Sequence, residues 1–144
     1  MDNHMPDSVL FVCNYNSVRS PMAECIAKSL CGDRIFIDSI GICKDLLKVN
    51  PFAISVMEET GLDLSAHKPK HFEDLHDTSI DLIICLSEEA KETMSELTRG
   101  NDTKIELWNT EDPSGVKGSR ENIMTAFREV AEELKGKIEQ RLCS

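Results

Sequence analysis

The residues best suited to chemistry lie in one short segment, residues 13 to 21, which reads CNYNSVRSP. A cysteine opens the segment, and an arginine follows six positions later, immediately before Ser20 and Pro21. Serine is a preferred helix N-cap and proline suits the first helical position, so a helix is expected to begin here. Because a cysteine and an arginine at this spacing often occur together by chance, the interpretation depends on the elements that flank the segment.

A loop of this composition is suited to holding an anion. Backbone NH groups of the loop and of the following helix N-terminus can point into one concavity that accepts a phosphate-like oxyanion. Arg19 can add two parallel hydrogen bonds to the same oxyanion. The other residues expected to bind the substrate are Asn14, Tyr15, Asn16, Ser17, Val18 and Ser20.

The sulfur of Cys13 is expected to be the nucleophile. A helix N-terminus and a neighbouring cation both favour the thiolate form of a cysteine, and a thiolate beneath a bound phosphate can displace a leaving group in line. Ser20 is placed to donate a hydrogen bond to that thiolate, in addition to capping the helix. Asn16 tolerates a left-handed backbone better than most residues, and a tightly curled loop needs such a residue.

This displacement also needs a proton donor, because an alkoxide or phenoxide leaving group must be protonated. Asp112 fits that role, since it follows an expected strand and precedes Pro113, which favours an extended backbone that can project the carboxyl group inward. The residues expected to be catalytic are therefore Cys13, Arg19 and Asp112.

Short β-rich runs alternate with segments of helical period along the chain. Strands are expected at residues 8–12, 34–39, 80–86 and 103–108, and helices at residues 20–30, 52–60, 119–142 and from a cap at Ser87 onward. This alternation predicts an α/β fold: a single three-layer domain over residues 1–144, with a four-stranded parallel sheet and helices on both faces. Ligands of such sheets bind at the carboxyl ends of the strands, where the Cys13 loop would lie.

The composition excludes several other function classes. With a net charge of -10 and 5% aromatic residues, the chain offers neither a basic stripe nor a stacking surface for nucleic acid. The longest apolar run, residues 80–86, is far shorter than the roughly 20 residues of a membrane helix. The N-terminus, MDNHMPDS, is polar and unlike a secretory signal, so we expect a cytoplasmic protein without a membrane partner.

Neither the cysteines nor the histidines are spaced as a metal site. None of the six cysteines belongs to a CxxC pair, and reduced thiols are expected. His67 and His71 are four residues apart, but Pro69 separates them, so we interpret them as solvent-exposed loop residues. No metal and no cofactor are expected.

The segment VLFVCNYNSVRSPMAE, together with Asp112 and Pro113, resembles the low-molecular-weight protein tyrosine phosphatases and their relatives, the thioredoxin-coupled arsenate reductases. The resemblance implies a sheet ordered 2-1-3-4 and hydrolysis of a phosphomonoester through a phosphocysteine on Cys13. Arg19 would bind the phosphoryl oxygens, and Asp112 would act first as general acid and then as general base. The implied substrate is a phosphotyrosine protein or a small aryl phosphate, and phosphate, sulfate or arsenate could occupy the loop.

Several positions depart from the phosphatase pattern. Val18 stands where these phosphatases usually carry a second cysteine, and Ser114 and Gly115 stand where tyrosines commonly stack on the substrate ring. Residues 42–49 contain no aromatic side chain. An aromatic wall for the substrate would therefore have to come from Tyr15 or Trp108.

Two other interpretations remain open. An arsenate reductase needs resolving cysteines after the third strand, where this chain has Ser87 and Met94. Cys43 and Cys85 are the alternative resolving thiols, whereas Cys25 and Cys31 are expected in the core and Cys143 in the C-terminal tail. A carrier that holds a phosphoryl group or an oxyanion without turnover would not need Asp112. The sequence favours the phosphatase.

Overall fold

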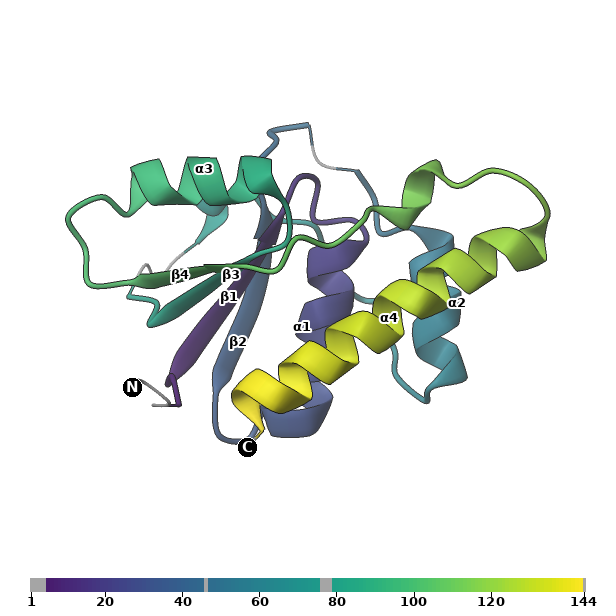
Figure 1. Cartoon of the computed structure of the whole chain (residues 1–144), viewed down its shortest axis with the longest axis horizontal. Helices are drawn as coiled ribbons and strands as arrows, with labels where there is room; N and C mark the ends of the chain where they lie inside the picture. Colours follow the sequence, from purple (N-terminus) through teal and green to yellow (C-terminus); the bar gives the residue numbers. More distant parts are fainter. Residues whose placement is uncertain (1–4, 46, 76–78, 144) are drawn as a thin grey trace.

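The computed structural model describes residues 5–45, 47–75 and 79–143, so the first four residues of the polar N-terminus lie outside the described residues. Strands and helices alternate along the chain, as expected (Figure 1). The strands are β1 (Ser8–Cys13), β2 (Phe36–Gly41), β3 (Leu82–Cys85) and β4 (Lys104–Leu107). The helices are α1 (Arg19–Cys31), α2 (Pro51–Glu59), α3 (Glu88–Leu97) and α4 (Arg120–Leu142), with short 3-10 helices η1 (Phe72–Asp74) and η2 (Pro113–Gly115).

The four strands form one parallel sheet in the order β2-β1-β3-β4, which confirms the expected order. Val12 in β1 lies beside Ile40 in β2 and Cys85 in β3, so β1 is a central strand. The chain runs from β1 to β2 on one side and then returns to β3 on the other. The strand order therefore reverses next to β1, and the crevice at its carboxyl end is where such sheets bind ligands.

Helices cover both faces of the sheet, as expected: α3 covers one face, and α1 and α4 cover the other (Figure 1). On the α3 face, Leu10 and Val12 belong to a buried cluster with Met94. On the opposite face, Phe11 belongs to a larger cluster that includes Phe127 of α4. Alternate residues of β1 thus contribute to two apolar layers, as the period of a strand requires.

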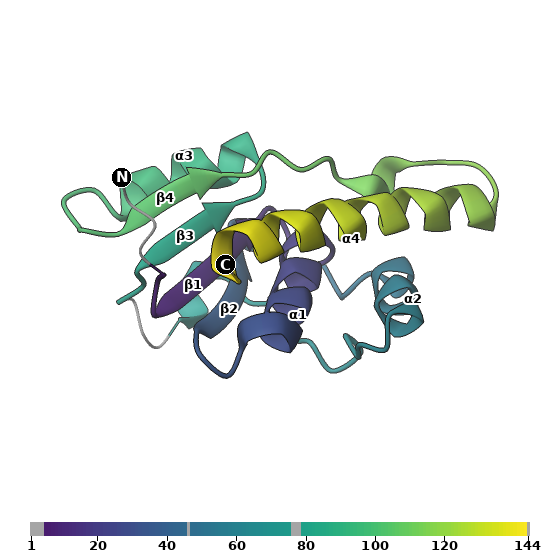
Figure 2. The same cartoon turned by 60° about the horizontal axis from the view of Figure 1, so that its bottom comes forward.

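Helix α2 packs on α4 rather than directly on the sheet (Figure 2). The rings of Phe52 and Phe127 lie 5.7 Å apart between these two helices. The helix begins as the sequence indicates, because Asn50 accepts a hydrogen bond from the Phe52 NH at 2.8 Å and Pro51 occupies the first turn. No helix in the described ranges is both long and apolar enough to cross a membrane.

The expected cap of α1 was wrong. The helix begins at Arg19, one residue before Ser20, and its N-cap is Val18, which makes no side-chain capping bond. Ser20 lies inside the first turn, and its hydroxyl group faces the sulfur of Cys13 instead of the helix end. By contrast, Ser87 caps α3 as predicted and accepts a hydrogen bond from the Ala90 NH at 3.1 Å.

Candidate active site

A small cavity lies at the carboxyl end of β1. It has a volume of about 50 Å3, and its walls come from the loop between β1 and α1, the segment before α2 and the segment after β4. It is lined by Cys13, Tyr15, Ser17, Val18, Arg19, Leu47, Asn50, Asp112 and Ser114. The fold thus brings the three residues expected to be catalytic together, in a space far below the roughly 300 Å3 at which pockets for drug-sized ligands begin.

The Cys13 sulfur lies 2.8 Å from the hydroxyl oxygen of Ser20. Both residues are almost fully buried. The Ser20 oxygen also accepts a hydrogen bond from the Asn16 side-chain amide at 2.8 Å. Because a thiolate can only accept, ionisation of Cys13 directs the Ser20 proton to the sulfur, which is the arrangement expected for a stabilised thiolate.

Asn16 holds the loop in its curled shape. Its φ of 55° lies in the left-handed region, as predicted. Its amide nitrogen donates to Ser20 at 2.8 Å and to Ser39 at 3.0 Å, and its oxygen accepts from the Lys70 NH at 2.9 Å. The His67 Nε2 lies 2.9 Å from the same oxygen. The side chain is therefore fully engaged behind the cavity and unavailable to a substrate.

This network extends away from the loop to Glu24. The Ser39 hydroxyl donates to the Glu24 carboxylate at 2.5 Å, and the His67 Nδ1 lies 3.7 Å from the same carboxylate oxygen. Burial lowers the pKa of His67, with the Glu24 charge opposing that effect, so the ring is neutral at pH 7. A neutral ring protonated on Nε2 donates to Asn16.

Nothing in the sequence marked Glu24, Ser39 and His67 as supporting residues. The expectation that His67 and His71 are solvent-exposed was wrong. His71 is buried, and only 9% of the His67 side chain is exposed. In the described residues, no group of three or more His, Cys, Asp or Glu side chains is arranged to hold a metal.

Gly41 gives the loop room to approach β2. A Cβ atom on Gly41 would lie 2.8 Å from the backbone nitrogen of Asn16 and 2.8 Å from the carbonyl carbon of Tyr15. Real Cβ atoms do not approach backbone atoms this closely. Immediately after Gly41, the Ile42 NH donates to the Cys13 carbonyl at 3.0 Å. A side chain at this position would therefore push the loop out of place.

Backbone carbonyls fix the orientation of Arg19. The guanidinium donates to the Thr110 carbonyl at 2.9 Å and to the Leu86 carbonyl at 3.4 Å. Its other terminal nitrogen lies 3.8 Å from the Asp112 carboxylate. Arg19 is 8% exposed, so its charge is held at the cavity with little solvent around it. Thr110, which sequence reasoning did not single out, anchors it from the segment after β4.

Asp112 has the extended backbone that Pro113 predicts, with φ of -83° and ψ of 113°. One carboxylate oxygen accepts the Ser114 NH at 3.0 Å, and the other faces Arg19. About a third of the side chain, 35%, is exposed. The carboxyl group therefore lies at the mouth of the cavity, where it can reach the leaving group of a bound substrate.

The loop NH groups provide donors without backbone partners. Among the described residues, the NH groups of residues 14 to 18 donate to no other backbone group. The side chains around them are occupied: the Asn14 side-chain oxygen Oδ1 accepts from the Ser87 hydroxyl at 2.7 Å, and the Ser17 hydroxyl donates to the Lys48 backbone carbonyl at 2.6 Å. Unpaired NH groups around a small cavity are the arrangement that binds phosphate-like anions.

Of the two aromatic residues considered for the substrate wall, only Tyr15 lines this cavity. It is 39% exposed, and Leu47, which also lines the cavity, is 54% exposed. Trp108 instead packs on Phe11, with ring centroids 6.1 Å apart, and lines a separate cavity beside α4. An aromatic substrate would therefore meet Tyr15 and Leu47.

The two alternative resolving thiols lie in different surroundings. Cys85 is fully buried in the cluster beneath α3, whereas Cys13 belongs to the cluster on the opposite face of the sheet. Burial raises the pKa of Cys85 to about 12, so it is an un-ionised thiol at neutral pH. Cys43 is half-buried, and its NH donates to the Asn14 carbonyl at 2.9 Å. Of these two cysteines, Cys43 is therefore the one whose backbone lies next to the loop that follows Cys13.

Comparisons with known proteins identify the family and the fold of this chain. The family model for low molecular weight phosphotyrosine protein phosphatase matches residues 8–143. Arsenate reductase 1 of Staphylococcus epidermidis is 34% identical over 132 residues, which cover 92% of each chain. A solved arsenate reductase in the phosphate binding state gives a TM-score of 0.75 at 30% identity, covering 95% of this chain and 97% of that one.

The low molecular weight protein tyrosine phosphatase from T. tengcongensis gives a TM-score of 0.76 at 28% identity, also covering 95% of this chain and 97% of that one. A solved arsenate reductase and a solved protein tyrosine phosphatase therefore both share the fold over nearly the whole chain. The match of the family model from residue 8 to residue 143 assigns the chain to the low molecular weight phosphotyrosine protein phosphatase family.

Proposed function

We propose that this protein is a cysteine-dependent phosphatase that hydrolyses phosphomonoesters through a phosphocysteine on Cys13. One observation carries the proposal: the buried Cys13 sulfur, 2.8 Å from the Ser20 hydroxyl, faces a cavity also lined by Arg19 and Asp112. A nucleophile, a fixed cation and a carboxyl group around one small space are the components that phosphoryl transfer to sulfur requires.

In the first step, the phosphoryl oxygens are held by the NH groups of residues 14 to 18 and by the Arg19 guanidinium. The Cys13 thiolate attacks phosphorus in line, so that an S–P bond forms as the P–O bond to the leaving group breaks. The electron pair of the broken bond passes to the leaving oxygen. Protonated Asp112 gives its proton to that oxygen, which leaves as an alcohol or a phenol.

In the second step, the Asp112 carboxylate takes a proton from a water molecule. The water oxygen attacks phosphorus, the S–P bond breaks, and the electron pair returns to Cys13 as a thiolate, which Ser20 stabilises. Inorganic phosphate leaves with the water oxygen. Each group thus returns to its starting state, and neither a metal nor a cofactor takes part.

The substrate class follows from the rim of the cavity. Tyr15 and Leu47 are exposed beside the opening and can pack on the ring of an aryl phosphate. Ser114 and the neighbouring Gly115 add no aromatic surface. We infer phosphotyrosine on a protein or a small aryl phosphate as the substrate, held by fewer aromatic contacts than a rim with two tyrosines would supply.

Arsenate reduction is the second candidate function, and the 34% identity to a staphylococcal arsenate reductase favours it. The same loop could hold arsenate, but reduction then needs thiols that accept the oxidising equivalents from the Cys13 adduct. The expected positions carry Ser87, which caps α3, and the buried Met94. Cys85 lies on the other face of the sheet, so Cys43 is the remaining thiol near the loop.

A side-by-side assay separates the two functions. One arm measures hydrolysis of p-nitrophenyl phosphate and of a phosphotyrosine peptide, and the other measures arsenate reduction with reduced thioredoxin or with glutaredoxin and glutathione. We expect hydrolysis in the first arm and no turnover in the second. Arsenate turnover without phosphatase activity would overturn the proposal and assign the reductase function instead.

A further inference from the structure

Exposed apolar side chains gather at the mouth of the Cys13 cavity. Tyr15 and Leu47, which line the cavity, are 39% and 54% exposed. Val116 is 40% exposed and lies two residues after Ser114, which also lines the cavity. A phosphate group makes no use of apolar contacts, so this part of the surface is suited to a region of the substrate beyond the phosphate.

The two other large apolar side chains that are exposed in the described residues lie away from this mouth. Phe36 begins β2, at the amino edge of the sheet. Leu97 ends α3, a helix that runs from the carboxyl end of β3 toward the amino end of β4. Exposed apolar surface is therefore concentrated at the carboxyl edge, and such concentrated patches mark interaction sites.

Lysine side chains flank the apolar surface. Lys44 and Lys48 are exposed in the loop that follows β2, and Lys117 is exposed in the segment after β4. The loop after β2 is held against the Cys13 loop, because the Ser17 hydroxyl donates to the Lys48 backbone carbonyl at 2.6 Å. Within residues 5–45, 47–75 and 79–143, none of the three lysines forms an ion pair. Asp45 is the only carboxylate between Lys44 and Lys48 in the sequence. The lysine charges are therefore available to an acidic group on a partner.

Carboxylates lie on the other side of the mouth. Helix α3 begins beside the Cys13 loop, because its N-cap Ser87 donates a hydrogen bond to the Asn14 side-chain oxygen at 2.7 Å. The first turn of α3 carries Glu88 and Glu89, and both are exposed. Because β2 and β3 lie on opposite sides of β1, the loop after β2 and the start of α3 flank opposite sides of the Cys13 loop. The mouth is thus basic toward β2 and acidic toward β3.

We propose that this mouth docks a protein segment in which acidic residues flank a phosphotyrosine, with the acidic flank lying toward the loop after β2. The inference rests on the proposed phosphatase function and narrows its substrate to phosphotyrosine within an acidic polypeptide. The phosphate occupies the cavity, and the tyrosine ring and an adjacent apolar residue pack on Tyr15, Leu47 and Val116. Flanking carboxylates pair with Lys44 and Lys48. A small aryl phosphate offers no second anion to these lysines.

Short-range charge pairing carries this recognition. The net charge of -10 repels an acidic partner at a distance, but salt screens that repulsion beyond about 8 Å at physiological ionic strength. At contact, one exposed ion pair strengthens binding by up to about fivefold. Glu111 is exposed in the same segment as Lys117 and offsets it, so Lys44 and Lys48 supply most of the preference. The preference should therefore be sensitive to salt and expressed in KM.

Phosphate release from three peptides tests the proposal, with p-nitrophenyl phosphate as a fourth substrate. The peptides have the same length and one phosphotyrosine, which is flanked by acidic, neutral or basic residues. At low salt, we expect kcat/KM for the acidic peptide to exceed that for the neutral peptide by about fivefold, through a lower KM, and the basic peptide to be the poorest. In about 0.5 M sodium chloride, the difference should fall below about twofold, because salt screens exposed charges.

Two charge-reversed variants separate local pairing from net charge. Lys48→Glu should lower the ratio of kcat/KM for the acidic peptide to kcat/KM for the basic peptide by about tenfold. Lys135→Glu is the matched control, because Lys135 is exposed about four turns along α4 from its start, away from the mouth. It changes the net charge equally and should leave the ratio within about twofold of wild type.

Each outcome of these assays decides between the alternatives. Equal kcat/KM for the three peptides, or equal ratios in Lys48→Glu and Lys135→Glu, would overturn the inference and leave the phosphatase function standing. Hydrolysis of p-nitrophenyl phosphate alone would also overturn it, in favour of a small phosphomonoester. Hydrolysis of none of the four substrates would contradict the proposed function itself.

Discussion

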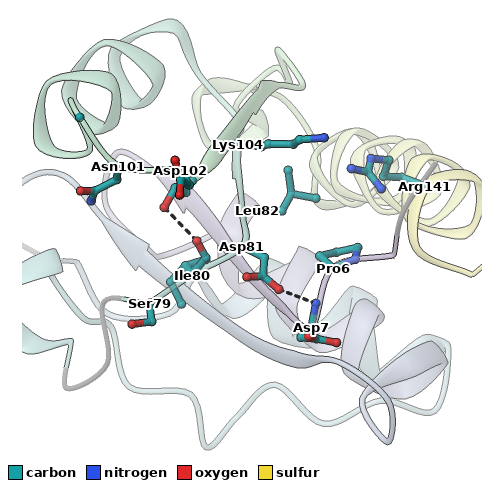
Figure 3. Close-up of a pocket in the computed structure, with 12 residues that line it drawn as sticks. Pro6, Asp7, Ser79, Ile80, Asp81, Leu82, Asn101, Asp102, Lys104 and Arg141 are labelled. Carbon is teal, nitrogen blue, oxygen red and sulfur yellow. Dashed lines mark hydrogen bonds between the residues drawn. The ribbon is translucent and has the colours of Figure 1, made fainter. Parts of the chain in front are cut away.

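Two cavities lie at opposite edges of the parallel sheet, and they differ in size and in chemistry. The cavity at the carboxyl edge, which Cys13 lines, has a volume of about 50 Å3. The cavity at the amino edge, formed by segments that precede β1, β3 and β4, has a volume of about 920 Å3 (Figure 3). By size alone, the amino edge would be the expected binding site.

Two of the charged side chains that line the larger cavity, Asp81 and Arg141, already have protein partners. The Asp81 carboxylate accepts the Asp7 NH at 2.8 Å (Figure 3). Arg141 is paired with Glu106 at 2.8 Å. At the carboxyl edge, by contrast, the NH groups of residues 14 to 18 have no backbone partner among the described residues, and Cys13 lines the same cavity. Donors without backbone partners beside a cysteine therefore distinguish the proposed active site from the larger cavity better than volume does.

The largest expected effect comes from removing the nucleophile at the carboxyl edge. Cys13→Ser should lower kcat for p-nitrophenyl phosphate by at least about 1,000-fold, because a hydroxyl group ionises far less readily than a thiol. The matched control is Cys25→Ser on α1, which should retain wild-type turnover in the same colorimetric assay. Comparable activity in wild type and Cys13→Ser would show that hydrolysis does not depend on Cys13 and does not take place in this cavity.

Removal of the proton donor should have a smaller effect that depends on the substrate. Asp112→Asn should reduce kcat for an alkyl phosphate by about 100-fold and for p-nitrophenyl phosphate by about 10-fold, because an activated phenolate leaves without a proton. Glu111→Gln removes the neighbouring, exposed carboxylate and should change neither rate. Equal losses on the two substrates would show that Asp112 is not the general acid.

Displacing the loop without touching a catalytic group should have a smaller effect again. Gly41→Ala puts a Cβ atom 2.8 Å from the Asn16 nitrogen, so we expect about a 10-fold loss of kcat and about 2 kcal/mol less stability. Gly136→Ala on α4 is the control, because open space surrounds that position. It should stabilise the protein by about 1 kcal/mol in chemical denaturation, since alanine favours a helix. Wild-type turnover in Gly41→Ala would mean that the loop tolerates displacement.

The smallest effect is expected at the amino edge. Asp102 is exposed and lines the larger cavity (Figure 3), so Asp102→Asn should leave kcat/KM for p-nitrophenyl phosphate within about twofold of wild type. Steady-state assays at several substrate concentrations measure this. A tenfold loss of kcat/KM would indicate that the larger cavity takes part in turnover. It would contradict the claim that only the carboxyl edge is catalytic.

Local signals in the sequence predicted the fold and the position of the loop. The β1 run and the extended Asp112 each depend on residues that are neighbours in the chain, and both were found as predicted. A helix does follow the loop, but it begins at Arg19, two residues before Pro21. The chemical roles of Cys13, Arg19 and Asp112 stay predictions until they are assayed.

Features set by distant contacts could not be predicted. Strand β2 was expected at residues 34–39 but spans Phe36–Gly41, because its end pairs with Cys13 in the neighbouring strand. The contact of His67 with Asn16 joins residues 51 positions apart. No short motif marks such a contact. For Ser20, the expected contact with the Cys13 sulfur was found at 2.8 Å, and only the additional role as helix cap was wrong.

Trapping the proposed intermediate tests the central claim most directly. Asp112→Asn should accumulate the phosphoenzyme with p-nitrophenyl phosphate, because the base that activates the hydrolytic water is missing. Rapid denaturation and trypsin digestion yield peptide 1–19, whose only cysteine is Cys13. We predict that mass spectrometry finds one phosphoryl group on this peptide, localised to the cysteine. An unmodified peptide 1–19 in enzyme that still releases phosphate would contradict the mechanism.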